Sequence, residues 1–273
     1  MMKSSFIVFL LATLLAVTGL SAQNQPAYKL PDVYRFDYQV VQLLSNKKNV
    51  ADSSLMYFFY TKSGDYAALR TSGKSNGQGN LSIVLTREGI CVISDERNKK
   101  ITIVSIRKLA SELSRLTKWI RMDSLAASMR NKGDRKDFQS VKTGKTKPAG
   151  NYQTEEYSIT GSKSHSGSVW CAKVDFLTPA DYLLGAVGVN WLQMINNNGR
   201  ATAHPLFQAL TTPKTLVTEI DIRDSTGAKR ISMHTVSIEP TTSTISTAGY
   251  TVNNYSEMTL PEIFQAEMKK RNN

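Results

Sequence analysis

The stretch that decides the fold is Asn80–Ile106, NLSIVLTREGICVISDERNKKITIVSI. Its three apolar runs are separated by two short polar segments, Arg87–Gly89 and Asp95–Lys99. Apolar runs of this length between turn residues are typical of β-strands, and short turns join antiparallel neighbours. The stretch therefore predicts three consecutive antiparallel strands.

The same arrangement recurs before and after this stretch. The segment Val33–Gln42 alternates apolar and mostly polar residues with a period of two, which indicates a single strand. Ser53–Gly73, Gly150–Phe176 and Thr215–Pro240 each consist of two strand-like runs around a Gly-containing turn. Successive hairpins at this spacing predict a largely antiparallel meander.

The late Ser/Thr-rich segment Glu239–Met258 is expected to be an irregular crossing segment, anchored by Ile245, Tyr250 and Val252.

Three helical segments interrupt the strands. The first begins near Ile106 and continues toward Met129, with apolar residues on one face and basic residues on the other. The second is Thr178–Ile195, with Thr178 as the N-cap and Asp181 three residues beyond it. The third runs from Pro261 to about Lys270. We therefore expect an α+β fold in which a strongly curved antiparallel sheet, a half-barrel, wraps around two or three helices.

The helix predicted at Thr178–Ile195 carries apolar residues around almost its whole circumference, so most of its surface should be buried. Two interpretations stay open. The helix either plugs the curved sheet or leaves an apolar concavity between helix and sheet for a lipidic ligand. For the second case the candidate lining residues are Phe36, Tyr38, Tyr57, Phe59, Trp170, Tyr182, Val187 and Trp191.

The first residues predict export from the cytoplasm. Lys3, an apolar run from Phe6 to Val17 and small residues up to Ala22 form a signal-peptide pattern, with residues 1–23 removed. No cysteine near the cut provides a lipid attachment site, and no later segment has about 18 consecutive apolar residues. We expect a periplasmic or secreted protein with one domain, residues 24–273, and no integral membrane segment.

Positive charge is concentrated in one part of the chain. Residues 97–147 contain 15 lysines and arginines against 4 acidic residues, a net charge of +11 in a chain of +12. Either this is a solvated basic face, or it contacts an anionic surface such as lipid headgroups or an acidic partner. Nucleic acid is not expected, because no aromatic-basic recognition motif is present. The candidate contact residues are Arg107, Lys108, Arg115, Lys118 and Arg121.

The residues that carry catalysis or bind metals show no recognisable pattern. The three histidines lie in neither metal-binding spacing nor a nucleophile elbow, so we expect no enzyme activity, no metal and no cofactor. The two cysteines, Cys91 and Cys171, lie in apolar strand-like runs. They either form a disulfide, which an exported protein allows, or are two buried thiols.

The Gly-Lys-Thr of Gly144–Thr146 resembles a phosphate-binding loop but fails its pattern. Gln139 stands where the first glycine is required, and Pro148 and Gly150 follow where a helix should begin. We interpret Thr143–Gly150 as a basic turn that leads into a strand.

The segment Thr143–Gly161, TGKTKPAGNYQTEEYSITG, followed by SVWCAKVDF, resembles a family of exported proteins known from Bacteroidetes, the domain of unknown function DUF4412. Thr143–Lys147, Tyr152, Tyr157 and Trp170 match its pattern, whereas Asn151 and Thr154 stand where glycine and cysteine are usual. The family is similar to the LolA/LolB and RseB-like group, whose curved sheet makes a concavity for acyl chains.

Three functions follow from these expectations. The leading hypothesis is a periplasmic protein that binds a lipid, or the acyl chain of a lipoprotein, without catalysis. The first alternative is a protein-interaction or envelope-stress-sensing module that binds an envelope protein and no small ligand. The second alternative is a hydrolase whose site is assembled from loops that are distant in sequence.

Overall fold

One large open sheet dominates the protein. The computed structural model describes residues 27–46, 53–71, 81–109, 139–160, 166–178, 181–182, 205–223 and 229–272. Twelve strands of these segments form one sheet in the order β14-β7-β6-β5-β4-β3-β2-β12-β11-β10-β9-β8. Sequence neighbours are therefore neighbours in space over two long runs, as a meander requires.

The strands of the first run, which are antiparallel to one another, are β2 (Tyr38–Asn46), β3 (Ser54–Tyr60), β4 (Tyr66–Thr71), β5 (Leu81–Thr86), β6 (Ile90–Asp95) and β7 (Lys100–Ser105). Those of the second run are β8 (Gln139–Ala149), β9 (Tyr152–Thr160), β10 (Ser166–Lys173), β11 (Thr215–Arg223) and β12 (Lys229–Pro240). β12 pairs with β2 and joins the two runs. The predicted antiparallel meander is confirmed.

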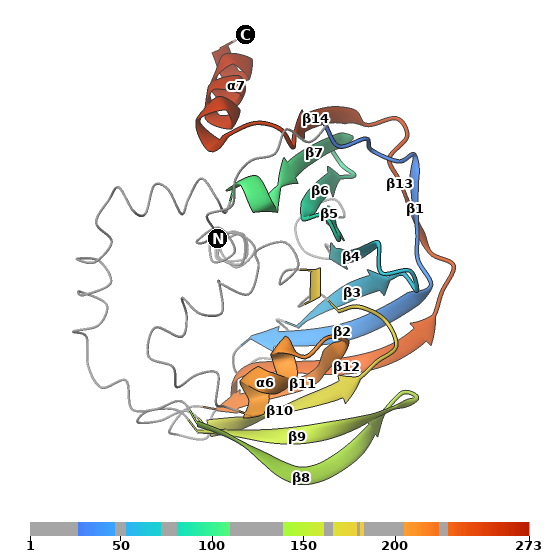
Figure 1. The fold of residues 1–273 in the computed structure, drawn as a ribbon, viewed down its shortest axis with the longest axis vertical. Helices are drawn as coiled ribbons and strands as arrows, with labels where there is room; N and C mark the ends of the chain where they lie inside the picture. The colour runs from blue at the N-terminus through green and yellow to red at the C-terminus, as the bar shows by residue number, and fades with distance from the viewer. Residues whose placement is uncertain are drawn as a thin grey trace, which may run out of the picture.

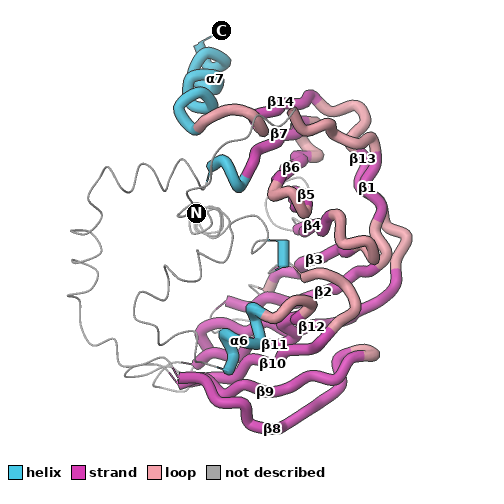
Figure 2. The backbone as a smooth tube through the Cα atoms, viewed as in Figure 1, coloured by secondary structure: helices cyan, strands magenta, loops and turns pink. Residues whose placement is uncertain are grey.

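The sheet is strongly curved. Figures 1 and 2 show its strands following an arc from β14 to β8. At the lower end the turn after β8 approaches β12, although three strands separate them in the sheet order. A Cβ atom at Gly150 would lie 3.5 Å from the Cβ of Ile238 on β12. The sheet does not close, because β8 and β14 (Thr251–Tyr255) remain edge strands.

A second, two-stranded sheet lies on the convex side of the arc. β1 (Val33–Arg35) pairs antiparallel with β13 (Thr244–Ser246), and Figure 1 shows both strands on the outer side of the meander. Tyr34 and Ile245 of this pair pack into one buried cluster with side chains of β3 to β7. The small sheet therefore covers the convex face of the large one over β3 to β7.

The described helical segments are short. α6 (Pro205–Thr211) packs against β8 and β11, and α7 (Leu260–Asn272) stands at the far end of the arc. A helical turn occupies 106–109, where a helix was predicted to begin. At the second predicted helix, Asp181 accepts hydrogen bonds from the backbone N–H and hydroxyl of Thr178, at 2.7 and 2.9 Å, which confirms this N-cap.

The remainder of the first two predicted helices, up to Met129 and Ile195, lies outside the described residues. The wrapping of the sheet around these helices therefore stays a prediction. No helix within the described residues is long and apolar enough to cross a bilayer.

Two local predictions, at Val33–Gln42 and Thr143–Gly150, were wrong. The single strand predicted at Val33–Gln42 is divided between β1 and β2, because the chain bends at Asp37, whose carboxylate accepts the Lys62 N–H at 2.7 Å. Of the turn predicted at Thr143–Gly150, residues 143–149 belong to β8, an edge strand, and only Gly150 lies in the turn that leads into β9. Edge strands tolerate proline and irregular glycines, here Pro148 and Gly144 with a φ of 79°.

The late Ser/Thr-rich segment was predicted to be irregular, yet it contains β13 and β14. β14 pairs parallel with β7, an exception to the antiparallel pattern. Of its predicted anchors, Ile245 is buried, Tyr250 is half-buried against the same apolar cluster, and Val252 is exposed.

The two cysteines do not form a disulfide. Cys91 on β6 and Cys171 on β10 are both free and buried, and they belong to separate apolar clusters. A disulfide requires Cα atoms within about 7 Å of each other, whereas β6 and β10 are not neighbours in the sheet. The second interpretation, two buried thiols, is confirmed.

Candidate functional site

The two faces of the strands β3 to β7 differ in how completely they are covered. On the convex face one residue from each strand lies beside the next across the sheet. All five are buried in the cluster sealed by β1 and β13. This sealed row consists of Phe59, Ala68, Val84, Val92 and Ile103.

The opposite, concave face carries a second cross-strand row, which is also apolar. Its members pair directly from β12 through β2 to β6. The first two are buried, whereas the last four are only half-buried. This concave row consists of Ile238, Val40, Phe58, Leu69, Ile83 and Ile93. Four adjacent half-covered apolar side chains on a concave sheet are the clearest candidate for a ligand-binding surface.

A segment that follows β10 covers one end of the concave row. This strap consists of residues 174–178 and 181–182, and its Phe176 and Tyr182 are buried against Val40. The Phe176 ring stacks on Tyr60 with centroids 4.6 Å apart. At the β3–β4 turn Gly64 has a φ of 70°, which favours glycine, and a Cβ there would lie 2.7 Å from the end of the Leu177 side chain of the strap.

Asp175 fastens the strap to two strands. Tyr38 of β2 and Tyr152 of β9 donate their hydroxyl hydrogens to its carboxylate, at 2.8 and 2.5 Å. The hydrogen bond from Tyr152 contributes most to lowering the pKa of Asp175, and the hydrogen bond from Tyr38 lowers it further. The same hydrogen bond to Asp175 raises the pKa of Tyr38. At neutral pH the strap is therefore held by an ionised carboxylate.

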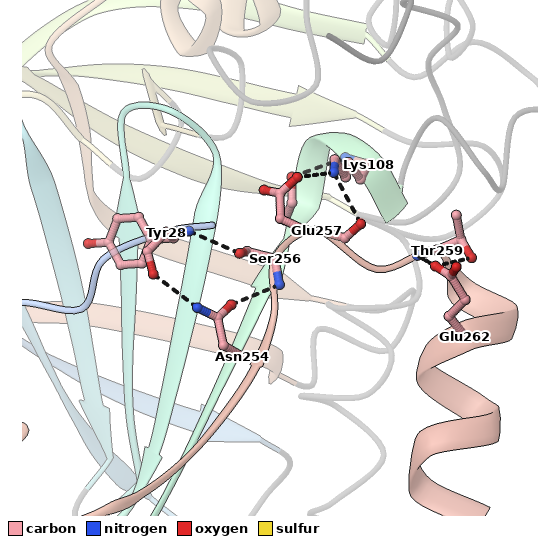
Figure 3. Close-up of polar contacts among 8 residues, drawn as sticks. Tyr28, Lys108, Asn254, Ser256, Glu257, Thr259 and Glu262 are labelled. Carbon is pink, nitrogen blue, oxygen red and sulfur yellow. Dashed lines mark hydrogen bonds and ion pairs between the residues drawn. The ribbon is translucent and has the colours of Figure 1, made fainter. Parts of the chain in front are cut away.

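The helical turn 106–109 covers the other end of the concave face. Ile106 is buried against Cys91, and the half-buried Ile83, Ile93 and Val104 pack around them. Lys108 donates to the carboxylate and the backbone carbonyl of Glu257, at 2.5 and 3.2 Å (Figure 3). The turn is thus tied to the segment between β14 and α7.

The predicted lining residues are not brought together into one surface. Phe36, Tyr57 and Phe59 belong to the sealed convex cluster, whereas Tyr38 and Tyr182 pack at the strap. Val187 and Trp191 lie outside the described residues. The alternation of the strands did not reveal which face would be sealed, because that depends on β1 and β13.

Trp170, the remaining predicted lining residue, belongs to a charged cluster instead. The Lys147 ammonium lies 4.1 Å from the centroid of its ring and pairs with Glu219 at 2.5 Å. His234 lies 3.4 Å from the same carboxylate. Neighbouring lysines of β8 are also paired, Lys142 with Glu155 and Lys145 with Glu156. The positive charge of this strand is therefore locally balanced.

The predicted anionic-contact residues are only partly described. Arg107 is exposed, whereas Lys108 is half-buried and engaged by Glu257. Arg115, Lys118 and Arg121 lie outside the described residues. The ion pair makes Lys108 a structural tether, so it is not a freely presented cation.

The described residues offer little for catalysis. They contain no group of three or more histidine, cysteine or acidic side chains placed to hold a metal. Burial raises the pKa of both Cys91 and Cys171 to about 12, so these thiols stay protonated at neutral pH and are poor nucleophiles. A depression of about 380 Å³ at the ends of β9 to β11 is lined mainly by polar residues, including Ser158, Asp221 and Arg223. Its polar lining does not suit an acyl chain.

Leu69, Ile83 and Ile93 were missed by the sequence-based prediction. For Ile83 and Ile93 a usable signal was present, since the runs LSIVL and ICVI are apolar at both odd and even positions. Strands of this composition are covered on both faces, by protein or by ligand.

Comparison with solved structures finds proteins to which this chain is similar at TM-scores below 0.5. No protein-family model matches the chain, and no curated protein matches it. An uncharacterised conserved protein from Thermus thermophilus has a TM-score of 0.38 and 8% identity, covering 80% of this chain and 90% of that chain. MucB has a TM-score of 0.32 and 10% identity, covering 75% of this chain and 53% of MucB. The structure of MucB in complex with MucA(peri) has a TM-score of 0.31 and 9% identity, covering 75% of this chain and 50% of that chain. Membership of DUF4412 stays a prediction.

Proposed function

We propose that this protein is an exported, non-enzymatic binding protein that holds a lipid or an acyl-bearing ligand against the concave face of its sheet. The observation that carries the proposal is the contrast between two apolar rows on the same strands. The sealed row is fully buried, whereas Phe58, Leu69, Ile83 and Ile93 of the concave row are half-buried. An acyl chain lying on these four residues would complete their burial.

The dimensions of the concave row suit such a ligand. Neighbouring strands are about 4.8 Å apart, so the four residues from β3 to β6 span roughly 15 Å, the scale of a fatty-acyl chain. The row runs across the strands from the strap to β6, and the helical turn 106–109 packs at its far end, in the cluster that includes Ile83 and Ile93. An extended chain would therefore lie perpendicular to the strands.

The first experiment asks whether the exported protein carries a ligand. Native mass spectrometry of the processed protein should show an added mass, and a fluorescent fatty acid should bind and be displaced by unlabelled fatty acid. The N-terminus measured in the same spectrum tests the predicted cleavage after residue 22 or 23. A ligand-free mass together with no fatty-acid binding would exclude the proposal and favour the protein-interaction alternative.

Two substitutions, one inside and one outside the concave row, then test whether this row binds the fatty acid. Leu69→Ser places a hydroxyl in the concave row, and we expect about three- to tenfold weaker fatty-acid binding, because the ligand would bury only the exposed part of a side chain whose full burial contributes about 1.5–3 kcal/mol. Val252→Ser on β14 is the matched control, because this exposed apolar residue lies outside the row. Equal affinity of the two variants would contradict the assignment, provided that circular dichroism shows both to be folded.

A further inference from the structure

The C-terminal helix α7 carries an exposed apolar stripe. Phe264 and Met268 are 64% and 65% exposed, and residues four apart lie on the same side of a helix. Figure 1 shows α7 standing away from the arc of strands. Two large apolar side chains that are exposed side by side on a surface helix mark an interaction surface.

The position of α7 is nevertheless defined. Thr259 donates its backbone N–H and its hydroxyl to Glu262, at 2.7 and 2.8 Å, which caps the first turn (Figure 3). The Tyr255 hydroxyl bonds to the carboxylate of Glu267 farther along the helix. Lys108 holds Glu257, just before the cap, at 2.5 Å. The stripe is therefore presented by a capped and tethered helix.

The distribution of charge along α7 indicates which kind of partner its apolar stripe suits. Both acidic residues of the helix, Glu262 and Glu267, accept hydrogen bonds from the protein itself. The sequence then ends the helix with three consecutive basic residues, Lys269, Lys270 and Arg271. An apolar stripe followed by a basic cluster is complementary to a membrane surface, where apolar groups enter the acyl boundary and cations meet anionic headgroups.

We propose that α7 is a docking element for anionic phospholipid membranes, with Phe264 and Met268 inserting into the interface and the positive charge of residues 269–271 attracting the anionic headgroups. This surface is distinct from the concave face, and its test does not depend on whether that face binds an acyl ligand. The binding is peripheral and reversible, because two apolar side chains and three charges give only modest affinity.

The test is sedimentation of the processed protein, residues 24–273, with phospholipid vesicles. We expect binding to vesicles of phosphatidylglycerol and phosphatidylcholine in equal parts, and much weaker binding to pure phosphatidylcholine. The double variant F264S/M268S should lose at least tenfold in affinity. Each substitution among Lys269, Lys270 and Arg271 to serine should lose about fivefold, with the loss diminished in high salt.

The matched control is Val236→Ser on β12, which removes an apolar side chain that is 57% exposed on another element. This variant should bind vesicles like the unmodified protein. A second readout is an environment-sensitive dye on Phe264→Cys, since the buried Cys91 and Cys171 should not react in the folded protein. Its emission should shift to shorter wavelength only with anionic vesicles.

Two results would overturn the proposal. One is vesicle binding that F264S/M268S leaves unchanged in a folded protein. The other is concentration-dependent self-association without vesicles that F264S/M268S abolishes, which would assign the stripe to a second copy of the chain.

Discussion

The two faces of strands β3 to β7 have the same apolar character but different surroundings. On the convex face, β1 and β13 complete a buried cluster that includes Val84 and Ile103. On the concave face, Ile83 and Ile93 are left half-buried between the strap and the turn 106–109. Alternating residues of one strand thus serve stability on one side and, in our proposal, binding on the other.

The largest expected effect is on stability. The same substitution, isoleucine to alanine, should cost more on the convex face than on the concave face. Ile103→Ala should lower the free energy of unfolding by about 2–5 kcal/mol, because Ile103 is fully buried. Ile83→Ala should cost about 1 kcal/mol in the ligand-free protein, because part of its surface already meets solvent. Urea denaturation of both variants measures the difference. Equal losses would mean that the concave face is packed as tightly as the convex one.

A smaller effect is expected at the strap, and it depends on pH. The pKa of Asp175 is lowered in the folded state, so the stabilisation is present above the unfolded pKa of about 3.9 and is lost as the pH falls through the folded value. Asp175→Asn should therefore cost about 1 kcal/mol at neutral pH, and this cost should diminish as the pH falls below about 3.9 and through the folded value.

Amide hydrogen exchange measures which part of the protein the Asp175→Asn substitution destabilises. In Asp175→Asn at neutral pH, amides of the strap should exchange faster, whereas those of β5 and β6 should not change. Faster exchange throughout the sheet would show that Asp175 stabilises the whole fold, and that the strap is not a separate cover of the concave face.

The comparison also shows what the sequence can predict. The meander followed from local alternation and turn residues, because antiparallel neighbours are close in the chain. The separation of β1 from β2 could not be predicted, because the alternation of Val33–Gln42 continues through the bend at Asp37. That bend depends on a hydrogen bond to Lys62, a residue of another turn.

The site was harder to predict than the fold, because it too depends on contacts between segments that are distant in the sequence. The aromatic residues Phe36 and Phe59 looked suited to a ligand, yet distant segments at β1 and β13 bury them. The parallel pairing of β14 with β7 joins segments about 150 positions apart, which no local pattern encodes. By contrast, the short helix α6 had a signal that was overlooked, a proline at its first position.

The central claim is that the concave row, and not the sealed row, contacts an acyl chain. The most direct measurement is photolabelling of the processed protein with a diazirine-bearing fatty acid, followed by mapping of the labelled residues by mass spectrometry. We predict labels at Leu69, Ile83 and Ile93 and none at their strand neighbours Ala68, Val84 and Val92. Labelling that fails to distinguish the two faces, or that competing fatty acid does not suppress, would contradict the account.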